Sequence, residues 1–152
     1  MTEEMDNSRR FGGIERLYGE ASYRRFLSAH VCVVGVGGVG SWVAESLARS
    51  AIGHLTLIDM DHVSESNINR QLAALSSTLG AAKVEVLKQR VDEINPHCDV
   101  ETVEEFVTVD NPGEWIPSDA DVVVDCIDSF RDKAALIAWC RRNKQLVITV
   151  GG

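Results

Sequence analysis

The chain has 152 residues, of which 45% are hydrophobic and 25% charged, and its formal net charge is −8 at pH 7. This length suits one domain with a single core, and the composition is that of an ordinary globular protein. The acidic balance argues against a protein that coats nucleic acid with a broadly basic surface. The longest apolar runs, such as residues 31–36, are too short to span a bilayer, so we expect no membrane contact from this segment.

The N-terminus and the cysteines indicate the compartment. The first ten residues are polar and mixed in charge, which excludes a secretory signal. The four cysteines, Cys32, Cys98, Cys126 and Cys140, form no CxxC pair and lack metal-ligand spacing. Cys32 and Cys126 fall in apolar strand patterns, where a free thiol usually acts as a small core residue. These features predict a reducing, cytoplasmic setting.

Helices and strands are predicted to alternate along the chain. Residues 16–29 have helical spacing and belong to a predicted N-terminal helical arm, residues 1–30. In the next helix Val39, Val43 and Leu47 recur every four residues. The remaining predicted elements are strands at 31–35, 55–58, 98–103, 122–126 and 146–150, helices at 38–51, 81–94 and 131–143, and a short helical turn around Trp115.

This alternation predicts βαβ units with right-handed crossovers. We therefore expect a Rossmann-like, doubly wound α/β fold with a mainly parallel sheet, formed by residues 31–152 as one domain. The chain ends directly after the fifth predicted strand. We expect it to be the N-terminal part of a longer domain, truncated after that strand.

A glycine loop follows the first strand and opens a helix, which is the context of a phosphate-binding turn. Gly35 permits a tight turn, Gly37 lets the backbone approach a phosphate, Gly40 permits close packing, and Gly38 is a further permissive position. The amide groups and the positive end of the helix dipole favour an anion. Asp59 ends the second strand about twenty residues later, where it can bind a ribose hydroxyl.

A polar octet, SESNINRQ, follows the second strand and Asp61. It carries Asn67, Asn69, Arg70 and Gln71, a set that a nicotinamide enzyme does not need at this position. Lys83 lies in the first turn of a predicted helix, where a cation is slightly unfavourable with the dipole and therefore indicates a compensating anion. Arg70 and Lys83 could together neutralise the β- and γ-phosphates of a nucleoside triphosphate.

The fourth strand ends in the sequence DCID, whose last residue is Asp128. This position is near the switch point of a doubly wound sheet, where ligands bind. A carboxylate beside a triphosphate most naturally holds Mg²⁺. We therefore predict ATP and Mg²⁺ as the ligands and Asp128 as the metal-binding acid.

Five motifs occur in the order GVGGVG, LIDMD, SNINRQ, GAAKVEVLKQRVDEINP and DCID. As a set they resemble the ubiquitin-activating-enzyme-like (ThiF-like) superfamily, over nearly the whole chain from about residue 10. Within that superfamily, RFGGIERLYG, AALIAWCRRNK and the closing TVGG are most similar to the tRNA threonylcarbamoyladenosine dehydratases. The resemblance implies an ATP-binding adenylation domain for residues 31–152 and a catalytic set of Arg70, Lys83 and Asp128.

The same resemblance implies further roles. Asp59 matches the ribose-binding acid, and Asn67 joins Arg70 and Lys83 in the phosphate-binding set. It also implies a homodimer in which an N-terminal arginine reaches the partner's nucleotide, with Arg10 and Arg16 as the two candidates.

The sequence leaves three functions open. The first is ATP-dependent cyclising dehydration of N6-threonylcarbamoyladenosine in tRNA, which the resemblance favours. The second is adenylation of the C-terminal glycine of a ubiquitin-like sulfur-carrier protein, and the third is a non-catalytic nucleotide- or NAD-binding domain.

Basic residues could supply contacts to tRNA, because they gather at the two ends of the chain. Solvated helix faces explain both groups, and a local phosphate-contacting patch is the alternative. The groups are Arg9, Arg10, Arg16, Arg24 and Arg25 near the N-terminus, and Arg141, Arg142 and Lys144 near the C-terminus.

Overall fold

The structure, a computed structural model, describes residues 7–151, so residues 1–6 of the predicted arm and Gly152 lie outside the described residues. Its centre is a five-stranded sheet in the order β3-β2-β1-β4-β5, and every pairing is parallel. The strands are β1 His30–Val34, β2 His54–Ile58, β3 Asp99–Val103, β4 Val122–Asp125 and β5 Val147–Thr149. The predicted doubly wound α/β fold is confirmed.

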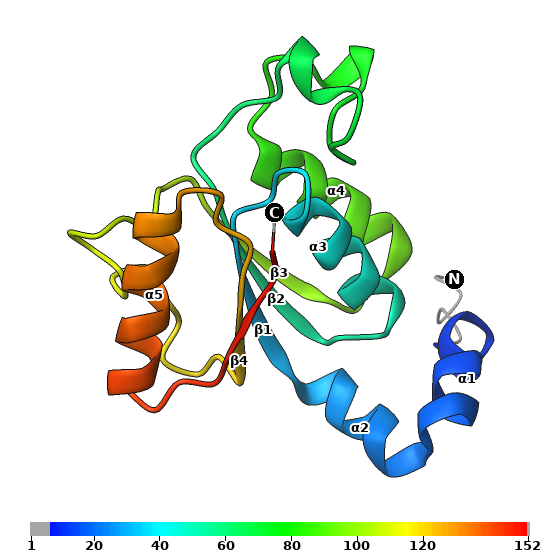
Figure 1. Ribbon diagram of the computed structural model, residues 1–152. Helices are drawn as coiled ribbons and strands as arrows, with labels where there is room; N and C mark the ends of the chain where they lie inside the picture. Colours follow the sequence, from blue (N-terminus) through cyan, green and yellow to red (C-terminus); the bar gives the residue numbers. More distant parts are fainter. Residues whose placement is uncertain (1–6, 152) are drawn as a thin grey trace.

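Helices cover both faces of the sheet (Figure 1). On one face α3 (Gly40–Arg49) and α4 (Lys83–Ile94) pack side by side, and α5 (Phe130–Arg142) covers β4 and β5 on the other. Chain order changes direction between β1 and β4, which are neighbours in the sheet but lie far apart in the sequence. None of the helices within residues 7–151 has the length and apolar character needed to cross a membrane.

Alternating residues of the strands build two hydrophobic cores. Val31 and Val33 of β1 face α3 and α4, whereas Cys32 and Val34 point into the core beneath α5. Burial on both faces requires an apolar run without polar interruptions. For this reason the valine-rich stretch of β1 identifies a central strand.

Two predicted elements were wrong. Residues 16–29 were predicted as one helix, but α1 (Asn7–Tyr18) and α2 (Glu20–Ser28) are separated at Gly19. Gly19 adopts φ +82°, a left-handed conformation that ends a right-handed helix. The region around Trp115 contains turns without a helix. Between β2 and α4 the chain makes two short 3₁₀ turns, η1 (Glu65–Asn67) and η2 (Ser76–Thr78).

An ion-pair network joins α3 to α4. The Glu45 carboxylate accepts hydrogen bonds from Nε and Nη2 of Arg90 on α4, and from Nε of Arg49, at 2.9 Å, on its own helix. The hydrogen bonds from Arg90 hold the pKa of Glu45 below its ordinary value, although partial burial opposes this. Because the pKa of Glu45 is lower in the folded chain than in the unfolded chain, the stabilisation is present above the unfolded value and is lost as pH falls through the folded value.

We predict that Glu45→Gln lowers the free energy of unfolding by about 1 kcal/mol at neutral pH, a value discounted for the partial exposure of Arg90. The difference from the parent chain should shrink as the solution is acidified. Urea unfolding at several pH values measures this. The control is Glu20→Gln, which removes the exposed pair with Arg24 and should cost less. A deficit for Glu45→Gln that does not depend on pH would contradict the assignment.

Candidate nucleotide site

One cavity of about 620 Å³ opens at the carboxyl ends of the parallel strands. Its walls come from the ends of β1, β2 and β4, from residues 105–108 after β3, and from Lys83 at the start of α4. It therefore lies where chain order reverses between β1 and β4, the place at which doubly wound sheets bind ligands.

The glycine loop has the geometry that its sequence predicts. Gly35 has φ +84°, and a Cβ there would lie 2.8 Å from the carbonyl oxygen of Cys126. A Cβ on Gly40 would lie 1.7 Å from the carbonyl oxygen of Gly35, so α3 can begin here only with glycine. Gly40 thus serves close packing and does not line the cavity, whereas Gly35, Gly37 and Gly38 line it.

The loop presents unpaired donors. Within residues 7–151, the backbone N–H groups of residues 37–40 find no acceptor, because the first bonds of α3 run from Ser41 to Gly37 and from Trp42 to Val39. Unpaired N–H groups at a helix N-terminus, together with the helix dipole, form a binding site for an anion.

Asp59 lines the cavity and fixes the glycine loop. Its Oδ2 accepts the Val36 N–H at 2.9 Å and its Oδ1 accepts the Asp61 N–H at 2.8 Å. Each carboxylate oxygen keeps a further lone pair, so a ribose hydroxyl remains compatible with both bonds. The acid that we predicted for the ribose also ties β2 to the turn after β1.

Arg70 and Gln71 lie against the loop. The Arg70 side chain packs over Gly38, with its Nε 3.7 Å from the position of an added Cβ, and Gln71 packs over Gly37. Both residues line the cavity. The Gln71 Oε1 atom is buried and has no hydrogen-bond partner among the described residues, which leaves an acceptor for a ligand donor.

Lys83 is a buried cation, only 5% exposed, at the first position of α4. Its Nζ lies 3.4 Å from Oδ2 of Asp61, whose side chain is 55% exposed to solvent. A buried ammonium requires nearby negative charge, and a half-exposed carboxylate at this distance supplies it weakly. An anionic group in the cavity would complete the compensation.

Asn67 and Asn69 stand apart from the cavity lining. The buried Oδ1 of Asn67 accepts the Ser64 N–H at 2.9 Å, which closes the 3₁₀ turn η1. Oδ1 of Asn69 accepts a hydrogen bond from Nη1 of Arg70 at 3.0 Å. In this structure the two asparagines shape and orient the segment that carries Arg70, and nucleotide contact by either residue stays a prediction.

Asp128 lines the cavity on the opposite side, and it is exposed. Sequence reasoning missed the residues near it: Asp132 and Glu105 also line the cavity, as does Phe106. Oδ1 of Asp132 accepts the Val109 N–H at 3.0 Å and so holds the segment after β3. The sequence could have indicated these residues, because they follow a predicted strand and the carboxyl ends of parallel strands share one edge of the sheet.

Cys126 is the thiol that lines the cavity. Burial, with a smaller contribution from Asp125, raises its pKa to about 11. The thiol is therefore protonated at neutral pH, whereas the thiolate is the nucleophilic form. The geometry supports binding and electrostatic stabilisation of an anionic ligand, in which the protonated Cys126 thiol takes no part as a nucleophile.

A family model confirms what the motifs indicated: the model described as the ThiF family matches residues 11–152. This chain belongs to the ThiF family.

The similar proteins of this family include tRNA-modifying enzymes. The chain is 53% identical over 149 residues to a tRNA threonylcarbamoyladenosine dehydratase of Haemophilus influenzae, and 55% identical over 143 residues to one of Escherichia coli. These matches cover 97% and 94% of this chain but 57% and 53% of the relatives. The ThiF chain thus spans a little over half the length of these relatives.

Solved structures of the E. coli dehydratase share the fold. The crystal structures of that enzyme with ATP and with AMP each superpose with a TM-score of 0.92 at 54% identity, covering 95% of this chain and 60% of theirs.

The N-terminal arginines of this ThiF chain lie away from its own cavity. Nη1 of Arg10 donates to the carbonyl oxygens of Glu93 and Ile94 at the C-terminus of α4, at 3.0 and 2.8 Å. Arg16 is exposed and folds back toward Gly12. The basic residues at 141–144 are exposed at the far end of α5, one helix length from the cavity (Figure 1).

A buried ion pair supports the Asp128 side of the ThiF cavity. Asp125 is 0% exposed, and its Oδ2 lies 2.8 Å from Nζ of Lys133. Nζ also donates to the Val150 carbonyl oxygen at 3.1 Å, while Oδ1 of Asp125 accepts the Ile127 N–H at 3.0 Å. The pair thus joins β4, α5 and the end of β5 below the residues that lead to Asp128.

We predict that Lys133→Met destabilises the chain by about 3 kcal/mol, because it leaves the Asp125 carboxylate buried without its cation. Adding Asp125→Asn to this variant should restore part of the loss. Urea unfolding of the single and double variants measures both effects. If Lys133→Met and the parent chain had the same free energy of unfolding, the ion pair would not stabilise the fold.

Proposed function

We propose that this chain is the nucleotide-binding part of an enzyme that uses ATP and Mg²⁺ to adenylate a carboxylate. One observation carries the proposal: the buried Lys83 ammonium and the free amides of residues 37–39 line one cavity, with Arg70 beside them. Such a concentration of donors and positive charge suits a polyphosphate better than a dinucleotide, whose pyrophosphate carries less charge.

The chemistry follows from the poor reactivity of a carboxylate, whose leaving group would be oxide. A carboxylate oxygen attacks the α-phosphorus of ATP, the bond to the β-phosphate oxygen breaks, and pyrophosphate leaves. The product is a mixed anhydride with AMP. In this scheme the loop amides and Lys83 position the phosphates and Arg70 stabilises the developing charge, which is how most phosphoryl-type transfers are catalysed.

Magnesium belongs to the same proposal. Mg²⁺ binds through one or two carboxylates together with substrate phosphates. Asp128 is the acid that we assign to it, and Asp132 and Glu105 line the same side of the cavity. When bound, the ion supplies charge neutralisation to the phosphates.

We further propose that the substrate is N6-threonylcarbamoyladenosine in tRNA. The names of the similar bacterial enzymes support this, and so do the solved complexes of the E. coli dehydratase with ATP and AMP. In the second step the neighbouring carbamoyl group closes onto the activated carbonyl and displaces AMP, with net loss of one water. A cytoplasmic setting, where tRNA is modified, belongs to this proposal, in agreement with four free cysteines.

A homodimer is part of the proposal as well. Arg10 already donates to two carbonyl oxygens of its own chain. We therefore assign to the exposed Arg16 the contact with the partner's nucleotide. The ends of α1 and α2 carry further exposed arginines that could accompany it.

The nucleotide assignment predicts that the chain binds ATP with Mg²⁺ and that removing Mg²⁺ weakens binding. Lys83→Met should weaken ATP binding at least about tenfold, since it deletes a buried charge-assisted contact. The matched control is Lys88→Met on the same helix, which leaves the cavity unchanged. Isothermal titration calorimetry measures ATP binding without Mg²⁺ and ATP binding by each of the two variants. Equal or tighter binding of NAD, or no effect of Lys83→Met, would overturn the assignment.

The substrate assignment predicts that the full-length protein dehydrates threonylcarbamoyladenosine in tRNA in the presence of ATP. Arg70→Ala should slow this by about 10²–10³, the typical cost of one lost transition-state contact. Nucleoside mass spectrometry detects the loss of one water. An ATP-binding, full-length protein that leaves the nucleoside unchanged would sink the tRNA assignment. Adenylation of a carrier protein's C-terminal glycine would then be the function to test.

A further inference from the structure

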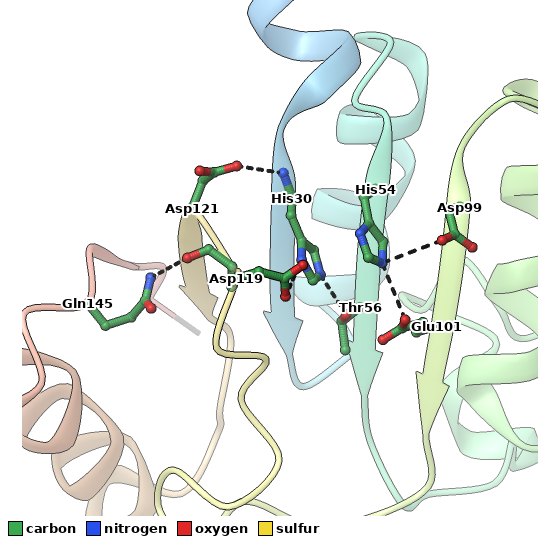
Figure 2. A network of polar contacts seen from close by, with 9 residues as sticks. His30, His54, Thr56, Asp99, Glu101, Asp119, Asp121 and Gln145 are labelled. Atoms are coloured by element: carbon green, nitrogen blue, oxygen red, sulfur yellow. Dashed lines mark hydrogen bonds and ion pairs between the residues drawn. The ribbon is translucent and has the colours of Figure 1, made fainter.

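A second polar cluster lies at the other end of the sheet, where the strands begin (Figure 2). His30 and His54 start the neighbouring strands β1 and β2 and are partners in register, and Asp99 is the partner of His54 on β3. Glu101 lies two residues beyond Asp99 and therefore on the same face. None of these residues lines the nucleotide cavity.

His30 is held by its own partners. Its Nδ1 lies 3.2 Å from Oδ1 of Asp119 and its Nε2 lies 2.8 Å from Oγ1 of Thr56. The ring of His54 stacks on this fixed ring, with centroids 3.6 Å apart and planes 8° from parallel. The stack restrains the His54 ring, so the direction in which its Nε2 lone pair points is set before any ligand arrives.

The Nε2 atom of His54 is buried and forms no hydrogen bond within residues 7–151. It points toward two carboxylates, with Oδ2 of Asp99 at 3.9 Å and Oε1 of Glu101 at 3.7 Å (Figure 2). These distances are too long for hydrogen bonds. They are close to the separation of about 3.4–3.6 Å between two ligand atoms that each lie about 2.1 Å from one metal ion in tetrahedral or trigonal geometry.

The chemistry of the three groups also fits a metal ion. The three ligand atoms all lie within 4.8 Å of one another. An imidazole nitrogen favours a transition metal over Mg²⁺ or Ca²⁺, and carboxylates supply negative charge to a dication. Asp99 and Glu101 are mostly exposed, so their side chains can close by the remaining few tenths of an ångström and water can fill the open position.

We propose that His54, Asp99 and Glu101 bind a divalent transition-metal ion, with Zn²⁺ as the ion of choice. The ion ties the central strand β2 to the edge strand β3 at their amino ends. His30 acts as a positioning residue, which stacks on the ligand His54 without binding the metal. The site is independent of the proposed nucleotide chemistry.

A cysteine adjoins the site, so thiolate ligation must be distinguished from the proposed one. Burial raises the pKa of Cys98 to about 12, and the thiolate is the form that ligates metals. Co²⁺ in place of Zn²⁺ reports the ligand type. The proposed nitrogen and oxygen ligands give a weak visible spectrum, whereas thiolate ligation adds an intense near-ultraviolet charge-transfer band.

The test is isothermal titration of the nucleotide-free chain with ZnCl₂, with one ion expected per chain. Glu101→Gln, a change at an exposed side chain, should weaken Zn²⁺ binding at least about tenfold, since even outer-shell changes cost that much. His54→Gln should abolish binding, with circular dichroism to confirm that the variant is folded. His62→Gln, at an exposed histidine, and Asp128→Asn, at the cavity, are the matched controls and should bind Zn²⁺ as the parent does.

Several results would overturn the proposal. One is the absence of Zn²⁺ binding by the parent chain. Another is Zn²⁺ binding that Glu101→Gln leaves unchanged, and a third is Zn²⁺ binding that His62→Gln or Asp128→Asn removes. A Co²⁺ complex with a thiolate charge-transfer band would likewise assign the ion to cysteine.

Discussion

The close approach of α3 to the end of β1 is the constraint on which the site depends. It is possible because Gly40 has no side chain. A Cβ at this position would clash with the carbonyl oxygen of Gly35. The contact holds the first turn of the helix against the edge of the sheet, so the free amides of residues 37–39 face the cavity. A helix that began even slightly farther away would carry its dipole and donors out of reach of a phosphate.

Around this fixed turn, each neighbouring residue serves both the fold and the cavity. Asp59 holds the loop through the Val36 amide and remains available to a ligand hydroxyl. Asn67 closes a 3₁₀ turn, and that turn delivers Arg70 to the surface of Gly38. Hydrogen bonds to the backbone hold these side chains in place before a ligand arrives. Because the side chains are already ordered, they lose little entropy when the ligand binds.

The two edges of the sheet collect different polar groups. The carboxyl edge of the sheet brings Lys83, Arg70 and the loop amides into one cavity with Asp59, Asp61 and Asp128. The amino edge collects histidines flanked by carboxylates. The exposed basic residues at the end of α5 lie toward this second edge, so any contact they make with nucleic acid is remote from the cavity within this chain.

The order and type of most elements could be predicted from the sequence, because they depend on the spacing of apolar residues and on residues that end helices, such as Pro96. The sequence also predicted several residues that line the cavity, among them Asp59, which directly follows β2, and Lys83, which begins α4. Gly19 separates α1 from α2, and this break was missed because the apolar residues on both sides keep helical spacing.

Which distant groups meet follows from the tertiary structure. The pairing of Asp125 with Lys133, the segment 105–108 beside the nucleotide site and the stack of His30 on His54 all require the order and register of the strands. That order brings β1 between β2 and β4, although β4 lies some ninety residues further along the chain. Local propensities act over a few residues, whereas strand register is fixed by burial on both faces of the assembled sheet, and this is the physical reason that these contacts appear only in the fold.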